Sequence, residues 1–363
     1  MNNKNVLSFA AIALGLFSAL VNVQVAWAQV AVVDVLENPA MPSQRLAERV
    51  LLAITHAGTR VVAVGEHGLV LLSDDQGESW RQAQVPVSVT LTNAYFVDAR
   101  EGWVVGHAGV VLHSADGGES WQKQLDGRAA AELVLAAALA LTPASPQRVA
   151  EAKRLVDDGP DKPLLDVHFR DSLHGLVVGA YGLAFTTDDG GRHWVPQMNI
   201  PNPRGKHLYR IAMIGQERFI VGEQGALFHS ANSGSSFSVL PTPYDGSYFG
   251  LLTDAKGLLL LYGLRGNLFL SDDAGQNWQE INSGGLVALA DGLHAQDGSL
   301  LLVDQAGRML RSENQGRSFQ SLAIAAVGPV AGITETENGN LLLAGLHGIT
   351  RIPSASLSMG VHQ

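Results

Sequence analysis

The hydrophobic positions of the chain fall into short runs that alternate with turns rich in glycine and aspartate. In one stretch this pattern predicts strands at residues 89–97, 102–105, 110–113 and 121–124, each separated from the next by a tight turn. Strands joined by such short connections pair antiparallel. We therefore expect this stretch to form one four-stranded antiparallel sheet.

The same unit recurs along almost the whole chain. Each second strand is followed by a phrase of glycine, two variable residues and glycine, with aspartate once in place of the first glycine. The phrase opens at Gly65, Gly106, Gly179, Gly222, Gly263, Asp304 and Gly345, at intervals of 41, 73, 43, 41, 41 and 41 residues. Four strands in a period near forty residues are typical of one β-propeller blade. Seven such periods predict an all-β, seven-bladed β-propeller.

A second phrase has the pattern S/T-x-D/N-x-G-x-x-W/F. Its acidic or amide positions are Asp75, Asp116, Asp189, Asn232, Asp273 and Asn314. An Asp or Asn side chain accepts hydrogen bonds from nearby backbone N–H groups, and a glycine in such a turn adopts a positive φ. We interpret these side chains of the Asp-box, or BNR repeat, as structural, because the turn itself uses them.

The two ends of the repeat region suggest how the ring closes. The seventh unit stops at Pro353 without an Asp-box. Its expected strands are residues 330–333, 341–344 and 349–352. Residues 30–36 form an apolar run before the first full unit, and we predict that this run supplies the missing outer strand of the seventh blade. The propeller would then span residues 29–353, with a tail at 354–363.

The one long interval comes from an insertion at residues 126–162, between the second and third blades. Asp126 can cap a helix at residues 129–141, and Ser145 can begin a second helix at residues 147–156. Because the insertion lies in a connection between blades, we expect the helical hairpin to overhang the same mouth as the glycine phrases. It is interpreted either as an ornament on the rim or as a lid or docking element for a partner.

The antiparallel strand order assigns the turns to two faces of the ring. Glycine-phrase hairpins share one face with the connections between blades, and the Asp-boxes lie on the other. One mouth should then be lined by Glu66, His67, His107, Tyr181, Glu223, Gln224, Arg265, Gln305, Arg308 and His347. These side chains differ from repeat to repeat, as binding positions of repeat proteins do. We predict that they line a partner-binding mouth.

Composition and charge narrow the classes of function. The formal net charge is −10 and the chain has no basic stripe, which argues against nucleic acid as a partner. The chain has no cysteine, so disulfides, thiolate metal sites and cysteine nucleophiles are excluded. No cofactor is expected.

The N-terminal region resembles a targeting segment. Lys4 precedes an apolar run at residues 6–21, and residues 26–28 have the small-x-small pattern of a cleavage site. We predict that residues 1–28 are a signal peptide and that the protein is exported to the periplasm. The alternative is an uncleaved anchor, which would leave the protein membrane-associated.

Residues 96–109 match the pattern F-x-D-x-x-x-G-W-x-V-G-x-x-G throughout, and residues 169–182 match it again with Leu176 in place of the aromatic residue. Together with the Asp-box, this repeat resembles the photosystem II stability/assembly factor family over essentially the whole chain after the signal peptide. The resemblance implies an exported, non-catalytic β-propeller that holds a membrane protein or its precursor during assembly of a complex. We expect a monomer. The helical insertion at residues 126–162 departs from the family pattern.

The Asp-box by itself also resembles sialidases. That resemblance implies a glycoside hydrolase acting on acidic glycans, in which three arginines bind a carboxylate. Arg265, Arg308 and Arg351 come from neighbouring blades and are the candidates in this chain, with Tyr181 and Glu223 as nucleophile and base. This enzyme is the competing interpretation.

Three hairpin histidines, His67, His107 and His347, come from blades that are neighbours in a closed ring. Three imidazoles can hold zinc or copper. Histidines in hairpins are more often solvated or bonded to the backbone, so no metal site is predicted.

Overall fold

The apolar runs form the strands of seven antiparallel sheets in the computed structural model, which describes residues 34–324 and 327–357. Blade 1 contains β1 (Leu51–Ala57), β2 (Arg60–Gly65), β3 (Val70–Ser73) and β4 (Arg81–Gln82); blade 2 contains β5 (Leu91–Phe96), β6 (Gly102–Gly106), β7 (Val111–Ser114) and β8 (Gln122–Leu125); blade 3 contains β9 (Leu164–Phe169), β10 (Gly175–Gly179), β11 (Ala184–Thr187) and β12 (Val195–Pro196). Blade 4 contains β13 (Leu208–Ile214), β14 (Glu217–Gly222), β15 (Leu227–Ser230) and β16 (Ser238–Val239); blade 5 contains β17 (Tyr248–Thr253), β18 (Leu259–Gly263), β19 (Leu268–Ser271) and β20 (Gln279–Glu280). Blade 6 contains β21 (Leu289–His294), β22 (Leu300–Asp304), β23 (Met309–Ser312) and β24 (Gln320–Ser321); blade 7 contains β25 (Val330–Glu335), β26 (Leu341–Gly345) and β27 (Gly348–Ile352).

Short helices complete the described elements. The α-helices are α1 (Gly127–Leu139) and α2 (Pro146–Asp158), and the 3₁₀ turns are η1 (Leu46–Glu48), η2 (Glu66–Gly68), η3 (His107–Gly109), η4 (Ala180–Gly182), η5 (Leu264–Gly266) and η6 (Ser354–Ser356).

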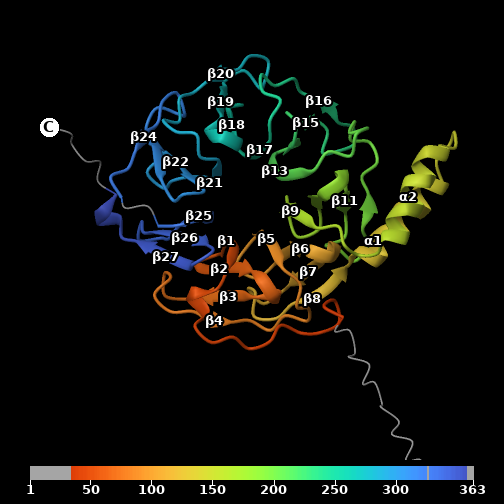
Figure 1. Cartoon of the computed structure of the whole chain (residues 1–363), viewed down its shortest axis with the longest axis horizontal. Helices are drawn as coiled ribbons and strands as arrows, with labels where there is room; N and C mark the ends of the chain where they lie inside the picture. Colours follow the sequence, from red (N-terminus) through yellow and green to blue (C-terminus); the bar gives the residue numbers. More distant parts are fainter. Residues whose placement is uncertain (1–33, 325–326, 358–363) are drawn as a thin grey trace, which may run out of the picture. The chain divides into compact units, whose positions relative to one another are not determined.

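The sheets form a closed ring. The first strand of each blade is its innermost strand and contacts the first strand of the next, and β25 of the last blade contacts β1 of the first (Figure 1). The seven-bladed propeller predicted from the repeat is therefore confirmed. The strands expected in the second repeat agree with β5 to β8 to within about two residues at each end.

The core is divided into seven layers, one between each pair of neighbouring blades. Since successive side chains of a strand point to opposite faces, a strand buried on both faces is apolar throughout. The second strands β6 and β10 are such strands, because every residue of both is buried, and in β2 every residue after Arg60 is buried. In the layer between blades 2 and 3, the rings of Trp103 and Phe169 stack with centroids 3.5 Å apart.

The first glycine of each phrase is required by a close approach of the backbone. A Cβ atom on Gly65 would lie 2.1 Å from the carbonyl oxygen of Val50, which precedes the innermost strand. The same contact recurs at Gly106, Gly179, Gly222, Gly263 and Gly345. The second glycine has a different role, because Gly68 and its equivalents have positive φ values that side chains disfavour.

The register of the strands defines two faces. Leu51 pairs with Gly65, so β1 begins at the end of the blade where β2 finishes and the glycine-phrase hairpin turns. We call this end, which also carries the connections between blades, the hairpin-tip face. The opposite end, which carries the Asp-box turns between the third and fourth strands, is the Asp-box face.

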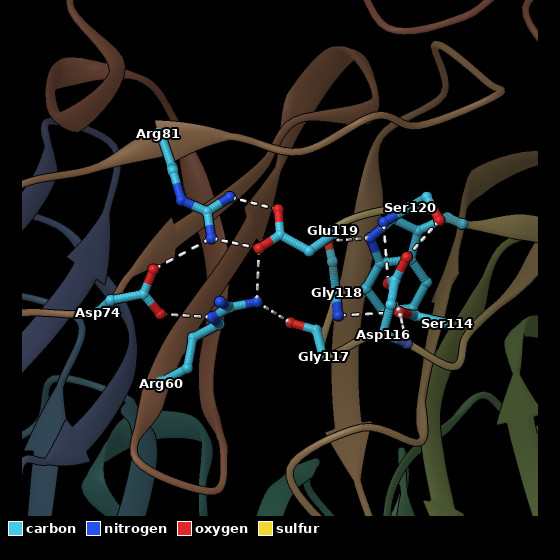
Figure 2. Close-up of polar contacts among 10 residues, drawn as sticks. Arg60, Asp74, Arg81, Ser114, Asp116, Gly117, Gly118, Glu119 and Ser120 are labelled. Carbon is cyan, nitrogen blue, oxygen red and sulfur yellow. Dashed lines mark hydrogen bonds and ion pairs between the residues drawn. The ribbon is translucent and has the colours of Figure 1, made fainter.

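Each Asp-box is a turn closed by its own side chains. In blade 2, the Ser114 hydroxyl donates to Asp116 Oδ1 at 2.8 Å and accepts the Gly118 N–H at 2.8 Å, and Asp116 also accepts the Ser120 N–H at 3.0 Å (Figure 2). The equivalent hydroxyl-to-Asp or -Asn bond measures 2.8–2.9 Å in the other five boxes. These hydrogen bonds occupy the Asp and Asn side chains within their own turns.

Two arginines of blade 1 join its Asp-box to that of blade 2. Arg60 contacts Asp74 Oδ1 at 2.6 Å and Glu119 Oε1 at 3.0 Å, and it donates to the Gly117 carbonyl at 2.9 Å. Arg81 contacts Glu119 Oε2 at 2.5 Å and Asp74 Oδ2 at 3.1 Å, which completes the square seen in Figure 2. The two positive and two negative charges neutralise one another across the boundary between the blades.

The prediction for ring closure is wrong in the part that the structure describes. Residues 34–36 belong to a turn, in which the Asp34 carbonyl accepts the N–H groups of Glu37 and Asn38, and not to a strand beside β27. Leu36 is buried between blades 1 and 2. Within the described residues blade 7 has three strands. Residues 30–33 and the predicted signal peptide lie outside the described residues.

Blade 7 instead closes onto blade 1 by side-chain packing. Leu342 and Ala344 share a buried layer with Leu51 and Ile54. Leu46 of η1 packs against this layer beside Ile349, so the segment before β1 touches the start of β27 without pairing with it. Burial of apolar side chains therefore replaces the backbone pairing that we expected.

The inserted helices begin as predicted but lie elsewhere. The side chains of Asp126 and Ser145 accept N–H groups in the first turns of α1 and α2. The hairpin reaches the hairpin-tip face, where α1 contacts the glycine-phrase turn η3, but it does not overhang the mouth: α1 also contacts β12, the outer strand of blade 3, and both helices lie at the perimeter of the ring (Figure 1). The reason is burial, because Ala130 and its neighbours on α1 pack into the outer part of the layer between blades 2 and 3.

The Asp-box geometry predicts which of two serines matters for folding. Ser114→Ala should lower the free energy of unfolding by about 1–3 kcal/mol, because the buried Gly118 N–H loses its acceptor. Ser120→Ala, at the exposed end of the same turn, should cost less than about 0.5 kcal/mol. Urea denaturation of both variants measures the difference, and equal losses would contradict the assignment.

Candidate functional site: the hairpin-tip face and the channel mouth

All ten residues of the predicted mouth lie on the hairpin-tip face, at or directly beside the glycine-phrase turns. Eight of them are exposed, whereas Glu223 and Arg308 are half-buried. His67, Tyr181, Gln224 and Arg265 have positive φ values, but so do Gln76 and Ala274 in the Asp-boxes. The left-handed backbone is therefore a property of both kinds of turn and does not mark a site by itself.

The structure brings three of the predicted residues together, between blades 3 and 4. The Tyr181 N–H donates to His207 Nδ1 at 2.8 Å, and the His207 N–H donates to Glu223 Oε1 at 2.8 Å. Lys206 Nζ donates to the Gln224 carbonyl at 2.8 Å. The connection that enters blade 4 is thus fixed between two hairpin tips.

From this point a series of aromatic rings runs toward the axis of the ring. The ring centroid of His207 lies 4.9 Å from that of Tyr181 and 6.4 Å from that of Tyr209. The Tyr209 ring in turn meets the Phe249 ring edge-on at 5.6 Å. Tyr209 and Phe249 are the second residues of the innermost strands β13 and β17, so the series reaches from an exposed tip to the channel mouth.

Below this mouth, polar side chains of the innermost strands form a chain across the channel. Asn93 donates to Asp166 Oδ1, and Asp166 Oδ2 accepts the Ile211 N–H of the next blade at 2.5 Å. Asp291 of blade 6 makes the same kind of contact with blade 7, because its Oδ2 accepts the Ile333 N–H at 3.1 Å. Each carboxylate thus satisfies a backbone N–H on the free inner edge of the following blade.

Arg210 connects the two carboxylates. Its Nη2 lies 3.1 Å from Asp291 Oδ1, although Arg210 belongs to blade 4 and Asp291 to blade 6. Blade 5 has Gly250 at the equivalent position of its innermost strand, and a Cβ atom there would lie 2.2 Å from the Tyr262 hydroxyl oxygen. The missing side chain leaves room for this hydroxyl, which donates to Asp291 Oδ1 at 3.4 Å.

The channel changes the acidity of these groups. Burial raises the pKa of Asp166 to about 6, although the charge of Arg210 and the Ile211 N–H act in the opposite direction. Burial alone would lower the pKa of Arg210, but the charges of Asp291 and Asp166 raise it on balance. Burial also lowers the pKa of His168 to about 4. Arg210 therefore stays charged as the counter-ion of both carboxylates.

The arginines proposed for a sialidase-like site do not converge. Arg308 bonds Asp304 Oδ2 at 2.9 Å and the Ser283 carbonyl at 2.8 Å, so it holds its own turn and the neighbouring connection. Arg351 contacts Glu78 at 3.2 Å, in the Asp-box of blade 1 on the opposite face. Only Arg265 lies at an exposed tip. The three-arginine arrangement is therefore wrong as a carboxylate site.

Two cavities in the described part of the chain are small and lie away from the channel mouth, one beside the helical insertion and one on the Asp-box face. They measure about 10 and 80 Å³, whereas pockets for drug-sized ligands measure roughly 300–1,000 Å³. No group of three or more His, Cys, Asp or Glu side chains among the described residues could hold a metal ion. His67, His107 and His347 each occupy a separate hairpin tip.

Several residues of the mouth were missed from the sequence. They are His207, Tyr209, Arg210, Phe249, Asp166 and Asp291. The mouth was predicted from the glycine-phrase tips because their residues differ between repeats, but the second and third residues of the innermost strands differ between repeats as much. These pairs are Leu52–Ala53, Thr92–Asn93, Leu165–Asp166, Tyr209–Arg210, Phe249–Gly250, Ala290–Asp291 and Ala331–Gly332. Comparison of the repeats at those positions would have found them.

A closed ring of seven blades, six of which carry an Asp-box turn, defines an Asp-box β-propeller. A model of the family described as "Photosynthesis system II assembly factor YCF48" matches residues 72–140 and 147–303, which is more than half of the chain. The chain belongs to this family, as the resemblance of its repeats implied.

Curated relatives match over a shorter stretch. The photosystem II assembly lipoprotein Ycf48 of Synechococcus sp. (strain CC9902) is 32% identical over 118 residues, which are 32% of this chain and 35% of that protein. The photosystem II stability/assembly factor HCF136 of rice, Oryza sativa subsp. japonica, is 25% identical over 143 residues, which are 37% and 34% of the two chains. The match thus spans about a third of the length of each relative.

Solved structures share the fold. A structure of YCF48 bound to a D1 peptide has a TM-score of 0.62 at 16% identity and covers 87% of this chain and 99% of that one. A streptogramin B lyase scores 0.65 at 13% identity, covering 88% and 99%. The GH74 xyloglucanase of Xanthomonas campestris scores 0.59 at 13% identity, covering 84% and 52%. At these identities the likeness establishes the propeller alone.

Removal of Arg210 tests the channel network. Arg210→Met should lower the free energy of unfolding by about 3–5 kcal/mol, because two enclosed carboxylates lose their counter-ion. Arg265→Met, at an exposed tip, should change it by less than about 0.5 kcal/mol. Chemical denaturation measures both. A small effect of Arg210→Met would mean that water in the channel, and not Arg210, compensates the carboxylates.

The raised pKa of Asp166 predicts a pH dependence. Between about pH 4 and 6 the folded protein holds a proton on Asp166 that the unfolded chain has released, so the stability contributed by this group falls as pH rises through that window. The free energy of unfolding of the original protein minus that of Asp166→Asn should therefore decrease from pH 4 to 6. Both proteins contain His168, whose lowered pKa makes its contribution to stability rise with pH, so the subtraction removes that contribution. A difference that rose with pH would contradict the assignment.

Proposed function

We propose that this protein is a non-catalytic assembly factor that holds an extended segment of a membrane protein at the channel mouth between blades 3 and 5. The observation that carries the proposal is the aromatic series from Tyr181 through His207 and Tyr209 to Phe249. Aromatic side chains provide large contact areas at little cost in conformational entropy, and they dominate the energetics of many interfaces.

Cationic groups beside these rings favour a segment with acidic or carbonyl-rich character. Lys206 is fixed in the loop that carries His207, whereas Lys162, whose Nζ lies 5.2 Å from the centroid of the Tyr181 ring, is already paired with Asp158 and Asp161. Arg204 is exposed in the same loop. Charged groups at the edge of an interface select among partners and speed their association.

Family membership supports this class of function. The Synechococcus relative is named a photosystem II assembly lipoprotein, and the YCF48 structure with the same fold contains a D1 peptide. By analogy we propose an envelope or membrane protein as the partner and export as the route, in agreement with the predicted signal peptide. Among the described residues, no helix is long and apolar enough to cross a membrane.

Site-specific cross-linking tests the proposal. A photo-cross-linking amino acid at Tyr181, introduced into the full chain in its native envelope, should form adducts with a membrane protein. The same group at Leu173, which is exposed on the Asp-box face, should form none. The combined change Tyr209→Ala and Phe249→Ala should reduce the Tyr181 adduct at least tenfold, since buried aromatic anchors contribute about 2 kcal/mol or more.

The matched control is His193→Ala, an exposed side chain in an Asp-box turn on the opposite face, which should leave the adduct unchanged. Adducts of equal yield at Leu173 would disprove that the partner binds specifically at the channel mouth. The competing glycosidase is tested separately on a panel of fluorogenic glycosides. Turnover that disappears in Arg265→Ala would favour the enzyme, whereas an assembly factor should show no turnover.

A further inference from the structure

The hairpin-tip face carries large apolar side chains that point into solvent. Leu286 is 86% exposed, Met41 80% and Leu346 50%, and Leu264 and Val287 are exposed as well. They come from blades 5, 6 and 7 and from the segment before blade 1. Single exposed leucines are ordinary, but several on one face of a propeller indicate contact with an apolar environment.

The most exposed of these residues stands on a loop that is held in place. Leu286 and Val287 belong to the connection between β20 and β21. The Ser283 hydroxyl donates to the Gly266 carbonyl at 2.7 Å, and Arg308 donates to the Ser283 carbonyl at 2.8 Å. The loop is therefore bonded to η5, which carries Leu264, and it presents its apolar side chains in a defined position.

The two faces also differ in charge. The loops between strands on the Asp-box face contain 16 acidic and 5 basic residues. The loops on the hairpin-tip face, apart from the helical insertion, contain 3 acidic and 4 basic residues. Membrane surfaces in cells are neutral or negatively charged. A negatively charged surface repels the acidic Asp-box face but not the hairpin-tip face.

The described chain also begins on the hairpin-tip face. The Val35 carbonyl accepts the Ser88 N–H at 2.9 Å, and Ser88 lies in the connection between blades 1 and 2.

We propose that the hairpin-tip face docks on a lipid surface, with Leu286, Val287 and Leu346 in the interfacial layer and the acidic Asp-box face toward water. These apolar residues stand on two separate loops, Leu286 and Val287 on one and Leu346 on the other, and each loop can enter a fluid surface. The proposal goes beyond the function proposed above. The two agree in geometry, because a segment emerging from the bilayer would reach the channel mouth directly.

The absence of cysteine from the chain permits a direct test. Leu286→Cys, Leu346→Cys and Leu173→Cys are each labelled with an environment-sensitive fluorophore, in protein that starts at Gln29. This form omits the apolar run, and it retains all seven buried layers, which are built from residues after Val33. The labelled proteins are mixed with vesicles of phosphatidylethanolamine and phosphatidylglycerol.

The labels at residues 286 and 346 should shift to the blue with vesicles, and the label at residue 173 should not. In flotation with the same vesicles, Leu286→Ser and Leu346→Ser should each lower the bound fraction roughly tenfold, because each removes one inserted leucine. Leu173→Ser, the matched control on the Asp-box face, should have no effect.

Three outcomes would overturn the proposal. They are no shift at residues 286 and 346, an equal shift at residue 173, and a shift that follows protein concentration without vesicles, which would identify a second copy of the chain as the occupant. Failure here leaves the proposed function intact, because the Tyr181 cross-link does not depend on vesicle binding. Conversely, loss of that cross-link would leave the vesicle result unchanged.

Discussion

The innermost strands of the ring each have one edge without a neighbouring strand, and the remaining structure depends on how those edges are satisfied. Backbone N–H groups that face a narrow channel need acceptors, since unpaired ones are costly. Asp166 and Asp291 accept such groups from the following blades, at Ile211 and Ile333. Carboxylates so enclosed need a counter-ion, and Arg210 provides it for both. With the Tyr262 hydroxyl of blade 5 on Asp291, the same chain of contacts links blades 2 to 7.

This constraint also shapes the surface available for binding. With the Asp and Asn side chains occupied inside their turns, the Asp-box face is repetitive and acidic. Variation is left to the hairpin tips and to the residues that begin the innermost strands. Tyr209 and Phe249 stand directly above the polar chain of the channel, one residue before Arg210 and Gly250. The hydrogen-bonded polar chain below them holds the Tyr209 and Phe249 side chains in place for a partner.

The two proposals describe one orientation of the molecule. Apolar tips around the ring would rest on a bilayer, and the aromatic rim would meet a segment of a membrane protein that leaves the same bilayer. The helices α1 and α2 stay at the perimeter, so they leave this approach open. The acidic Asp-box face would then point into the surrounding water.

The sequence by itself determined the features that are local. The repeat period gives the number of blades, the Asp-box residues fold their own turns, and Asp126 and Ser145 begin the two helices. Each depends on residues a few positions apart. The residues of the channel were not predictable in this way, because Arg210 and Asp291 are 81 positions apart and meet only after the ring has closed.

Tertiary structure alone decided the remaining questions. Leu36 lies between blades 1 and 2 because that layer could bury it, although its sequence suited a strand in blade 7 equally well. Arg308 is fixed by Asp304 and Ser283, although its place directly after the glycine phrase suggested a free binding group. Burial and long-range charge pairing depend on which surfaces meet in space, and a periodic sequence offers each segment several equivalent neighbours.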